Sequence, residues 1–301
     1  MRGRGGARGG RAPSAPWSSR LKPVELDPLE AMGLPSKGDK RLLDPKAQER
    51  YHLEIIKRYM TFCSDAGERD ELLRRFASLN PPSANDASSR SAPKSGKPSS
   101  PKQDDSKALS DVLLALRKLR EGIVASKRTD HFAVQAYIFC IRLSILVKHP
   151  ESYHPAILHL LRRIHPVHSM TTLELNEVTS YLVLDAACRR NNLGEAFALR
   201  HRYRLKDAKV DAVLDALTHD NYVEFKRLKQ RVDGHRAKLL EYADESVRKH
   251  LLKCFSRTYL SVDLSFLETS ADSSWARLTG EDGVGWELDG SKVVIRKVKA
   301  R

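Results

Sequence analysis

The sequence predicts an all-α helical repeat, preceded by a disordered tail and closed at its C-terminal end by a small α/β winged helix. Three observations predict this fold class. Apolar residues recur at helical spacing across residues 108–243, a β-hairpin pattern follows within residues 244–301, and residues 1–43 are rich in Gly, Pro, Arg and Ser. A segment with few apolar side chains cannot offset the entropy of ordering.

Between the tail and the repeat, we expect a helical pair at residues 44–79 and a disordered linker at residues 80–107. Asp44 precedes Pro45, and an N-cap followed by a proline at the first helical position marks a helix start. The linker is rich in Pro and Ser, a composition typical of flexible connections. The apolar stripe of the pair runs through Tyr51, Leu53, Ile55, Ile56, Tyr59, Met60, Leu72, Leu73, Phe76 and Leu79.

The helical repeat opens with an amphipathic segment at residues 109–124. Residues 132–147 are apolar on almost every face, which predicts a buried helix. Pro150 ends this helix, and Pro155 can begin the next one at residues 155–164.

Further helix starts follow along the repeat. Thr171 and Glu174 have the spacing of a capping box ahead of another apolar stripe. No sequence repeat of fixed length is visible, so the pattern does not favour a tetratricopeptide array. Three shorter helices are expected at residues 193–203, 207–218 and 220–232.

Residues 244–301 are predicted to form the winged helix. Asp289 and Gly290 form the strongest short-range turn signal, and β-prone runs flank them. The order of helix, strand, helix and hairpin is that of a winged helix. Its elements are expected at residues 245–259 (helix), 262–267 (edge strand), 270–278 (helix), and 284–288 and 292–296 (hairpin strands).

The charge of the chain is +15, and both of its ends are basic. A basic excess favours a polyanionic partner such as RNA, DNA or an acidic protein, although solubility would explain part of it. Two RGG units, at residues 4–6 and 8–10, are suited to flexible RNA contact, and a solubilising tail or an organelle presequence are the alternatives. The candidate nucleic-acid-binding residues are Arg4, Arg8, Arg11, Lys292, Arg296, Lys297 and Lys299.

A winged helix can also dock onto partner subunits without touching nucleic acid, and docking is the function that we favour here. The candidate docking residues are Tyr259, Trp286 and Val294, of which Trp286 could equally belong to the core. The cationic runs at residues 201–206 and 226–231 could follow a phosphate backbone, but they are more simply interpreted as solvated helix faces.

The sequence lacks the motifs that several classes of function require. No P-loop, GxSxG, HExxH or GxGxxG pattern occurs, so we expect no enzyme, no cofactor and no small-molecule substrate. No run of eighteen apolar residues occurs, so we expect a soluble intracellular chain without a membrane partner. The cysteines have no CxxC spacing, and the histidines at residues 154–168 lack accompanying ligands, so we expect no metal.

Residues 216–228 read Ala-Leu-Thr-His-Asp-Asn-Tyr-Val-Glu-Phe-Lys-Arg-Leu. This segment resembles the ALxxGNYVxFFRL pattern of the GANP, or leucine permease transcriptional regulator, branch of the PCI-domain superfamily. It departs from that pattern at His219 and Asp220, where a Gly is expected, and at Lys226, which replaces the second Phe. The alternative branch contains the eighth signalosome subunit, a proteasome lid subunit and the k subunit of initiation factor three.

The resemblance implies stacked helical pairs that lead into a winged helix, and other PCI-type subunits as partners. It implies a non-enzymatic scaffold in a nuclear complex that links transcription or mRNA processing to mRNA export, with RNA contact through the basic tail and wing. The alternative branch implies a structural subunit of a proteasome lid, signalosome or initiation-factor-three-like assembly that acts through protein contacts only. The expected location is the nucleus or, alternatively, both nucleus and cytoplasm.

Overall fold

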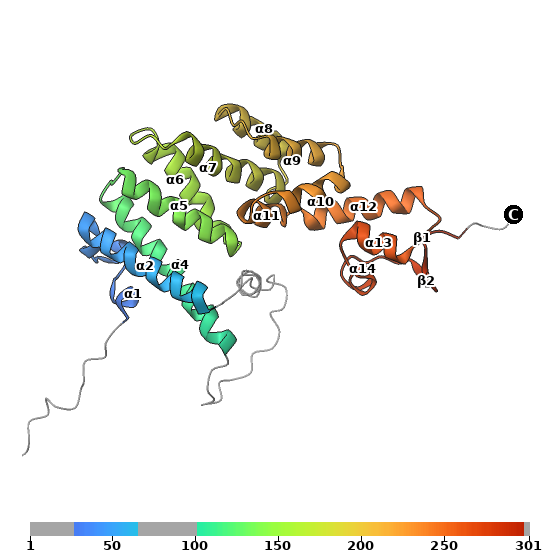
Figure 1. Ribbon diagram of the computed structural model, residues 1–301, viewed down its shortest axis with the longest axis horizontal. Coiled ribbons are helices and arrows are strands. Elements are labelled where there is room, and N and C mark those ends of the chain that lie inside the picture. The colour runs from blue at the N-terminus through green and yellow to red at the C-terminus, as the bar shows by residue number, and fades with distance from the viewer. Residues whose placement is uncertain (1–26, 66–100, 298–301) are drawn as a thin grey trace, which may run out of the picture.

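Helices dominate the computed structural model of the protein, which describes residues 27–65 and 101–297, without the side chains of residues 101–106. The helices stack side by side along the molecule and lead to a small three-stranded antiparallel sheet near the C-terminal end (Figure 1). Two separate hydrophobic clusters hold the chain together, one within residues 29–243 and one within residues 251–293. The prediction of a helical body ending in a small mixed module is therefore confirmed at this level.

Residues 27–43 are ordered, so the prediction that the disordered tail extends to residue 43 is wrong. They form α1 (Pro28–Ala31) and two 3-10 turns, η2 (Pro35–Lys37) and η3 (Arg41–Leu43). Leu29 and Leu42 are buried in the main core, and the Leu29 carbonyl accepts hydrogen bonds from Tyr51 and Lys118. Two isolated leucines give no periodic signal, although their burial anchors the segment. Arg4, Arg8 and Arg11 lie outside the described residues.

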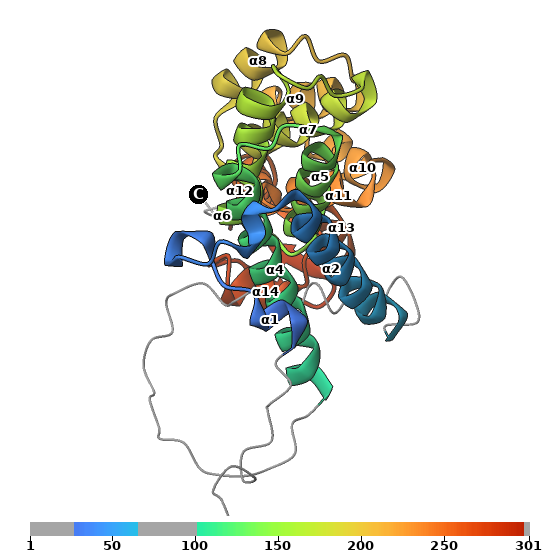
Figure 2. The ribbon, with the colours of Figure 1, turned by 90° about the vertical axis from the view of Figure 1, so that its left-hand side faces the viewer.

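The next helices are α2 (Pro45–Asp65) and α4 (Pro101–Ala125), which pack side by side (Figure 2). Gln48 near the start of α2 donates to Ser126 just beyond α4, so the two helices are antiparallel. A Cβ atom at Gly122 would stand 2.7 Å from the Leu42 carbonyl oxygen, so only glycine permits this approach. The predicted linker is wrong from residue 101 onward, where α4 already begins, and residues 66–79 of the predicted pair lie outside the described residues.

The centre of the stack contains α5 (His131–Leu146), α6 (Pro150–His159) and α7 (Thr172–Leu184). Burial of α5 on nearly every face is confirmed. The predicted helix start at Pro155 is wrong, because Pro150 occupies the first turn of α6, where a missing N–H costs nothing, and Pro155 lies inside the helix. The predicted capping box of Thr171 and Glu174 is confirmed.

Three more helices follow close to their predicted limits: α8 (Leu193–Arg202), α9 (Ala208–Thr218) and α10 (Tyr222–Arg231). A short helix, α11 (Gly234–Leu240), then returns to pack on α5 and α7. A polar side chain caps the N-terminus of each of these four helices by accepting backbone N–H groups. The caps are Asn192, Asp207, Asn221 and Asp233.

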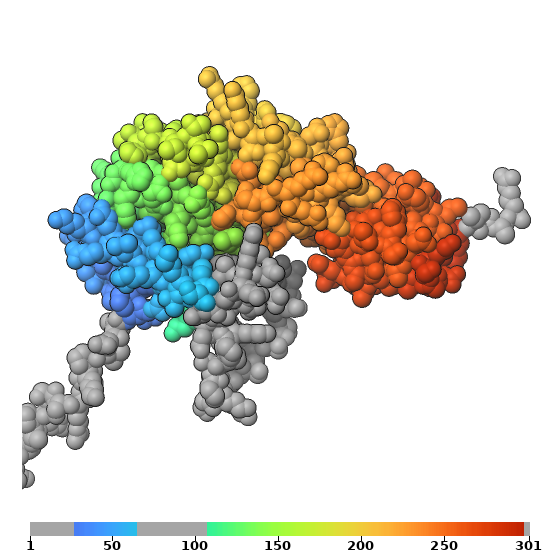
Figure 3. Space-filling view, viewed as in Figure 1, coloured from blue at the N-terminus to red at the C-terminus, as the bar shows by residue number. Residues whose placement is uncertain are grey.

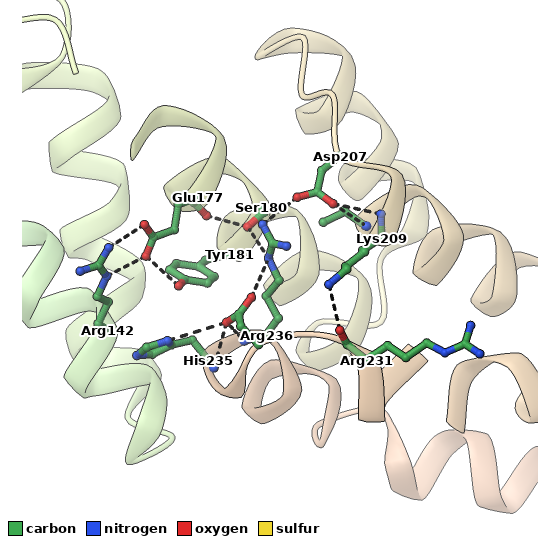
Figure 4. Close-up of polar contacts among 11 residues, drawn as sticks. Arg142, Glu177, Ser180, Tyr181, Asp207, Lys209, Arg231, His235 and Arg236 are labelled. Carbon is green, nitrogen blue, oxygen red and sulfur yellow. Dashed lines mark hydrogen bonds and ion pairs between the residues drawn. The ribbon is translucent and has the colours of Figure 1, made fainter. Parts of the chain in front are cut away.

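A polar network holds α11 against its neighbours (Figure 4). Arg142 of α5 binds Glu177 of α7 with two hydrogen bonds of 2.7 Å, and Tyr181 donates to the same carboxylate. Arg236 of α11 donates to Ser180 of α7 and forms a 2.7 Å ion pair with Asp207, the cap of α9. The network therefore connects α5, α7, α9 and α11 through charged hydrogen bonds.

A buried carboxylate lies where α6, α7 and α8 meet. Asp185, which is fully buried, begins a π-helical turn, η5 (Asp185–Arg189), at the end of α7. Its oxygens accept hydrogen bonds from Tyr153 at 2.7 Å and from Arg189 at 2.6 and 2.9 Å, and a further one from Arg190 at 3.2 Å. Burial alone would raise the pKa of Asp185, but the hydrogen bonds from Arg189 and Tyr153 lower it below the usual value.

Residues 244–297 form the C-terminal module. Its helices are α12 (Asp244–Thr258), α13 (Leu264–Ala271) and α14 (Trp275–Gly280), and its strands β1 (Ser261–Asp263), β2 (Glu287–Asp289) and β3 (Lys292–Val294) are ordered β1-β3-β2. The module projects at one end of the molecule (Figure 3).

The predicted strand at residues 262–267 is wrong after Asp263, where α13 begins. Leu264, Leu267 and Ala271 have helical spacing, and Leu267 and Ala271 are buried in the module core. The predicted helix at residues 270–278 is divided, because Asp272 takes a left-handed conformation with φ of 52° that ends α13.

We expect Asp185→Asn to lower the free energy of unfolding by about 3 kcal/mol at neutral pH, because it removes the buried carboxylate that pairs with Arg189 and leaves Arg190 with Glu195 alone. The lowered pKa of Asp185 means that its stabilisation is present above about pH 4, the range of an unfolded Asp, and is lost as the pH falls further. Urea denaturation at several pH values measures both effects.

Glu195→Gln is the matched control, because Glu195 also pairs with Arg190 but is 38% exposed. This variant should lower the free energy of unfolding by less than about 1 kcal/mol. Equal losses in the two variants would contradict the role of Asp185.

Candidate partner-docking and nucleic-acid surface

The register of the sheet determines which side chains of its strands face the core of the C-terminal module and which face away from it. Val262, Val293 and Leu288 are cross-strand neighbours and share one face of the sheet. Val293 is fully buried and Val262 nearly so, which identifies this face as the one packed on α12, α13 and α14. Val294 therefore points to the other face, between Ser261 and Glu287, and is half-buried.

Tyr259 and Phe266 form an exposed apolar patch beside the module core, with side chains that are 41% and 48% exposed. Leu260, the residue after Tyr259, is 52% exposed. The rings of Tyr259 and Phe266 both contact Phe255 of α12, with centroid distances of 5.1 and 5.8 Å. Phe255 is buried, so the patch is an outward continuation of the core.

The predicted docking residues thus differ in position. Tyr259 belongs to the apolar patch, whereas Trp286 is half-buried and packs against the module core. Sequence reasoning missed Leu260 and Phe266. Phe266 could have been found from the helical spacing of Leu264, Leu267 and Ala271, which leaves Phe266 off the buried stripe.

A basic corner of Lys253, Arg257 and Arg296 adjoins the apolar patch. Arg296 donates through Nη2 to the Arg257 carbonyl at 2.6 Å, and its backbone N–H reaches the Leu260 carbonyl at 3.1 Å. Lys253 lies one helical turn before Arg257 on α12. All three side chains are exposed, and none pairs with a carboxylate in the described part of the chain.

The other predicted cations of the β2–β3 hairpin lie near acids. Lys292 is aligned between Asp263 and Asp289 on the neighbouring strands, and Lys297 forms a 2.7 Å ion pair with Glu287. Lys299 lies outside the described residues. Of the predicted cations, the structure thus brings Arg296 to the backbone on either side of Tyr259, whereas Lys292 and Lys297 lie near carboxylates. Lys253 and Arg257 were missed, although their i, i+4 spacing on a predicted helix was visible.

The cationic run of α10 contacts the C-terminal module. Lys226 donates to the Thr269 carbonyl at 2.6 Å and pairs with Asp272 at 3.3 Å, both at the end of α13. Lys229 pairs with Asp244 at the start of α12. These two lysines line a cavity of about 420 Å³ between the helical body and the module. Their charges therefore contribute to the attachment of the module.

Other kinds of site find no support within residues 27–65 and 107–297. No group of three or more His, Cys, Asp or Glu side chains there is placed to hold a metal ion. Among the helices that the structure describes, none is both long and apolar enough to cross a membrane.

We expect Asp282→Ala to lower the stability of the C-terminal module by about 3 kcal/mol, because it removes one partner of a buried ion pair. Arg248 and Asp282 are 9% and 3% exposed and lie 2.8 Å apart, joining α12 to the segment after α14. Because the module has its own core, amide hydrogen exchange should accelerate in the module and stay unchanged in α5.

Glu281→Ala removes the neighbouring exposed pair with Arg277 and is the control. This variant should have little effect on amide hydrogen exchange in the C-terminal module. Acceleration throughout the chain by Asp282→Ala would show that the module does not unfold separately.

No protein-family model matches the chain. No curated protein matches it either. We therefore argue its function from the charges and exposed side chains of the C-terminal module, since a fold alone does not define what a protein does.

Proposed function

We propose that the protein is a non-enzymatic PCI-type scaffold subunit of a nuclear complex that links transcription or mRNA processing to mRNA export. In this proposal the C-terminal module is a winged helix that docks a second PCI-type subunit and also contacts RNA. The observation that carries the proposal is the apolar patch beside the basic corner. Both belong to the C-terminal module, which lies at the end of the molecule away from α2 and α4 (Figure 1).

The arrangement of elements supports the proposed family. Stacked helices lead into the order α12, β1, α13, α14, β2, β3, and a three-stranded sheet of order β1-β3-β2 suits a winged helix. Asp220 stands where the family pattern has Gly, and it adopts a left-handed conformation with φ of 52°, which glycine favours and aspartate tolerates. Lys226, which replaces the second Phe, contributes to module attachment instead.

The apolar patch is suited to protein docking. Exposed aromatic and aliphatic side chains that gather beside a core are typical of interfaces, and tyrosine is enriched among the residues that dominate binding energy. Tyr259 and Phe266 are held by their contacts with buried Phe255, so they lose little conformational freedom when a partner covers them.

The basic corner is suited to single-stranded RNA. Arg257 and Arg296 are exposed beside the apolar patch and can pair with phosphates while Tyr259 remains available to the docked subunit. Both arginines keep their charge free of carboxylates among the described residues, so phosphate does not have to displace an existing ion pair.

Docking is tested by affinity purification of the tagged protein from its own cells, with and without RNase, followed by mass spectrometry. We expect mRNA-export or mRNA-processing proteins, including a PCI-type subunit that remains after RNase treatment. The double variant Tyr259→Asp/Phe266→Asp should lose that subunit. Leu173→Asp alters an apolar side chain that is 82% exposed on α7 and should retain it. Retention by the double variant would contradict docking through the patch.

RNA contact is tested by fluorescence titration of a single-stranded RNA at several salt concentrations. Arg257→Gln/Arg296→Gln should weaken binding and reduce the slope of log affinity against log salt by about 1.4, which corresponds to two phosphate contacts. Lys292→Gln/Lys297→Gln removes the same charge from the hairpin, where carboxylates lie nearby, and should change the slope less. Equal slopes for the two double variants would rule out the basic corner as the RNA site.

A second candidate is a structural subunit of a proteasome lid, signalosome or initiation-factor-three-like assembly that acts through protein contacts alone. The pairing of Lys297 with Glu287, and the alignment of Lys292 between two aspartates, favours it because the hairpin then carries little free charge. In the same purification, a stoichiometric set of such subunits that is insensitive to RNase would support this candidate.

A further inference from the structure

A pocket lies on the helical body, far from the C-terminal module in the sequence. It is bounded by η2, η3, α4 and α6, and its volume is about 710 Å³. Sites for small molecules in proteins usually measure about 300–1,000 Å³ and combine apolar walls with a few convergent polar groups. We call it the Arg120 pocket, after the arginine of α4 that lines it.

The walls of the Arg120 pocket are largely apolar and partly flat. Leu43, Val124 and Ala156 supply aliphatic surface. The rings of Tyr137 and His159 stack with centroids 5.2 Å apart and an angle of 21° between their planes. Burial, followed by the nearby charges of Arg163 and Arg120, lowers the pKa of His159, so its ring is neutral at neutral pH. The wall is therefore uncharged and suited to a planar ring.

Arg120 lies in the wall between this pocket and a second one that is lined by Ser152, and it brings a positive charge to both. Its Nη1 donates to the Ser152 carbonyl at 2.9 Å, whereas its Nε is buried without a hydrogen-bond partner. It forms no ion pair with a carboxylate of the described residues. An anion bound beside the guanidinium would gain a charge-assisted hydrogen bond that no carboxylate of the described residues now supplies.

The acids of the same pocket are already neutralised. Asp39 forms an ion pair with Arg41 at 2.6 Å, and Glu121 accepts from Ser36 at 2.9 Å and pairs with Arg117 at 3.3 Å. The charge available to an occupant is therefore positive. Apolar walls with the cations Arg120 and Lys40 complement a flat apolar molecule that carries one negative charge.

We propose that the Arg120 pocket binds a small aromatic carboxylic acid, with its ring against the aliphatic and stacked-ring walls and its carboxylate toward Arg120. The carboxylate forms a charge-assisted hydrogen bond with the guanidinium, and the ring removes apolar surface from water. This binding site is independent of the C-terminal module and of the proposed scaffold function.

The test uses two fluorescent probes with the same ring system on the full chain. Anilinonaphthalene sulfonate carries a negative charge, and phenylnaphthylamine is its neutral counterpart. Arg120→Gln should weaken the anionic probe about 10- to 100-fold and leave the neutral probe nearly unchanged, since the charged hydrogen bond to the probe is lost while the apolar walls remain. Retained binding of the neutral probe also shows that the variant is folded. Naphthoate, a carboxylate, should compete with the anionic probe.

Ala125→Trp fills the pocket from an exposed position on its rim and should abolish the binding of both probes at this site. Arg202→Gln, which alters an exposed arginine on α8, is the matched control and should leave both affinities unchanged. Anionic-probe binding that survives Arg120→Gln would overturn the proposal, as would binding of both probes that survives Ala125→Trp or a failure of naphthoate to compete.

Discussion

The buried carboxylate of Asp185 is the interaction on which the helical body depends. A carboxylate without water requires donors, and this one obtains them from Tyr153 on α6 and from Arg189 and Arg190 beyond α7. The π-helical turn η5 matters here because it brings both arginines around a single acid. The directional hydrogen bonds to Asp185, together with apolar packing, therefore determine how α6, α7 and α8 lie relative to one another.

Packing and hydrogen bonds connect the surroundings of Asp185 to the C-terminal end of the helical body through α11. This helix packs on α5, on α7 and on η5, and Arg236 connects it to both Ser180 and Asp207. The chain then continues into α12, and Lys226 and Lys229 of α10 form ion pairs with Asp272 and Asp244 of the C-terminal module. Because the module has a separate core, these polar contacts orient it without merging it into the helical body.

The candidate surfaces differ from much of this strongly basic protein because their arginines are not paired with carboxylates. Many cations of the described chain lie beside carboxylates, so net charge alone is a poor guide to a polyanion site. The basic corner and the Arg120 pocket share one property, an arginine that no described carboxylate neutralises. One lies exposed beside an aromatic ring, and the other lies in a concave apolar pocket, so the two favour different partners.

The sequence by itself determined the helical class and most helix positions. Periodicity identified buried α5, Thr171 with Glu174 identified the start of α7, and Asp289 with Gly290 identified the hairpin. These are local signals, because caps, turns and apolar stripes are encoded within a few residues.

Tertiary structure alone decided the burial of Leu29 and Leu42, the partner of α2, and which cations stay free. Lys292 and Arg296 look alike in sequence, but strand register places Lys292 between two acids, while Arg296 lies beside Arg257. The Arg120 pocket likewise unites η2, α4 and α6. Each of these features depends on segments distant in sequence, whose approach is set by packing across the whole molecule and leaves no local pattern.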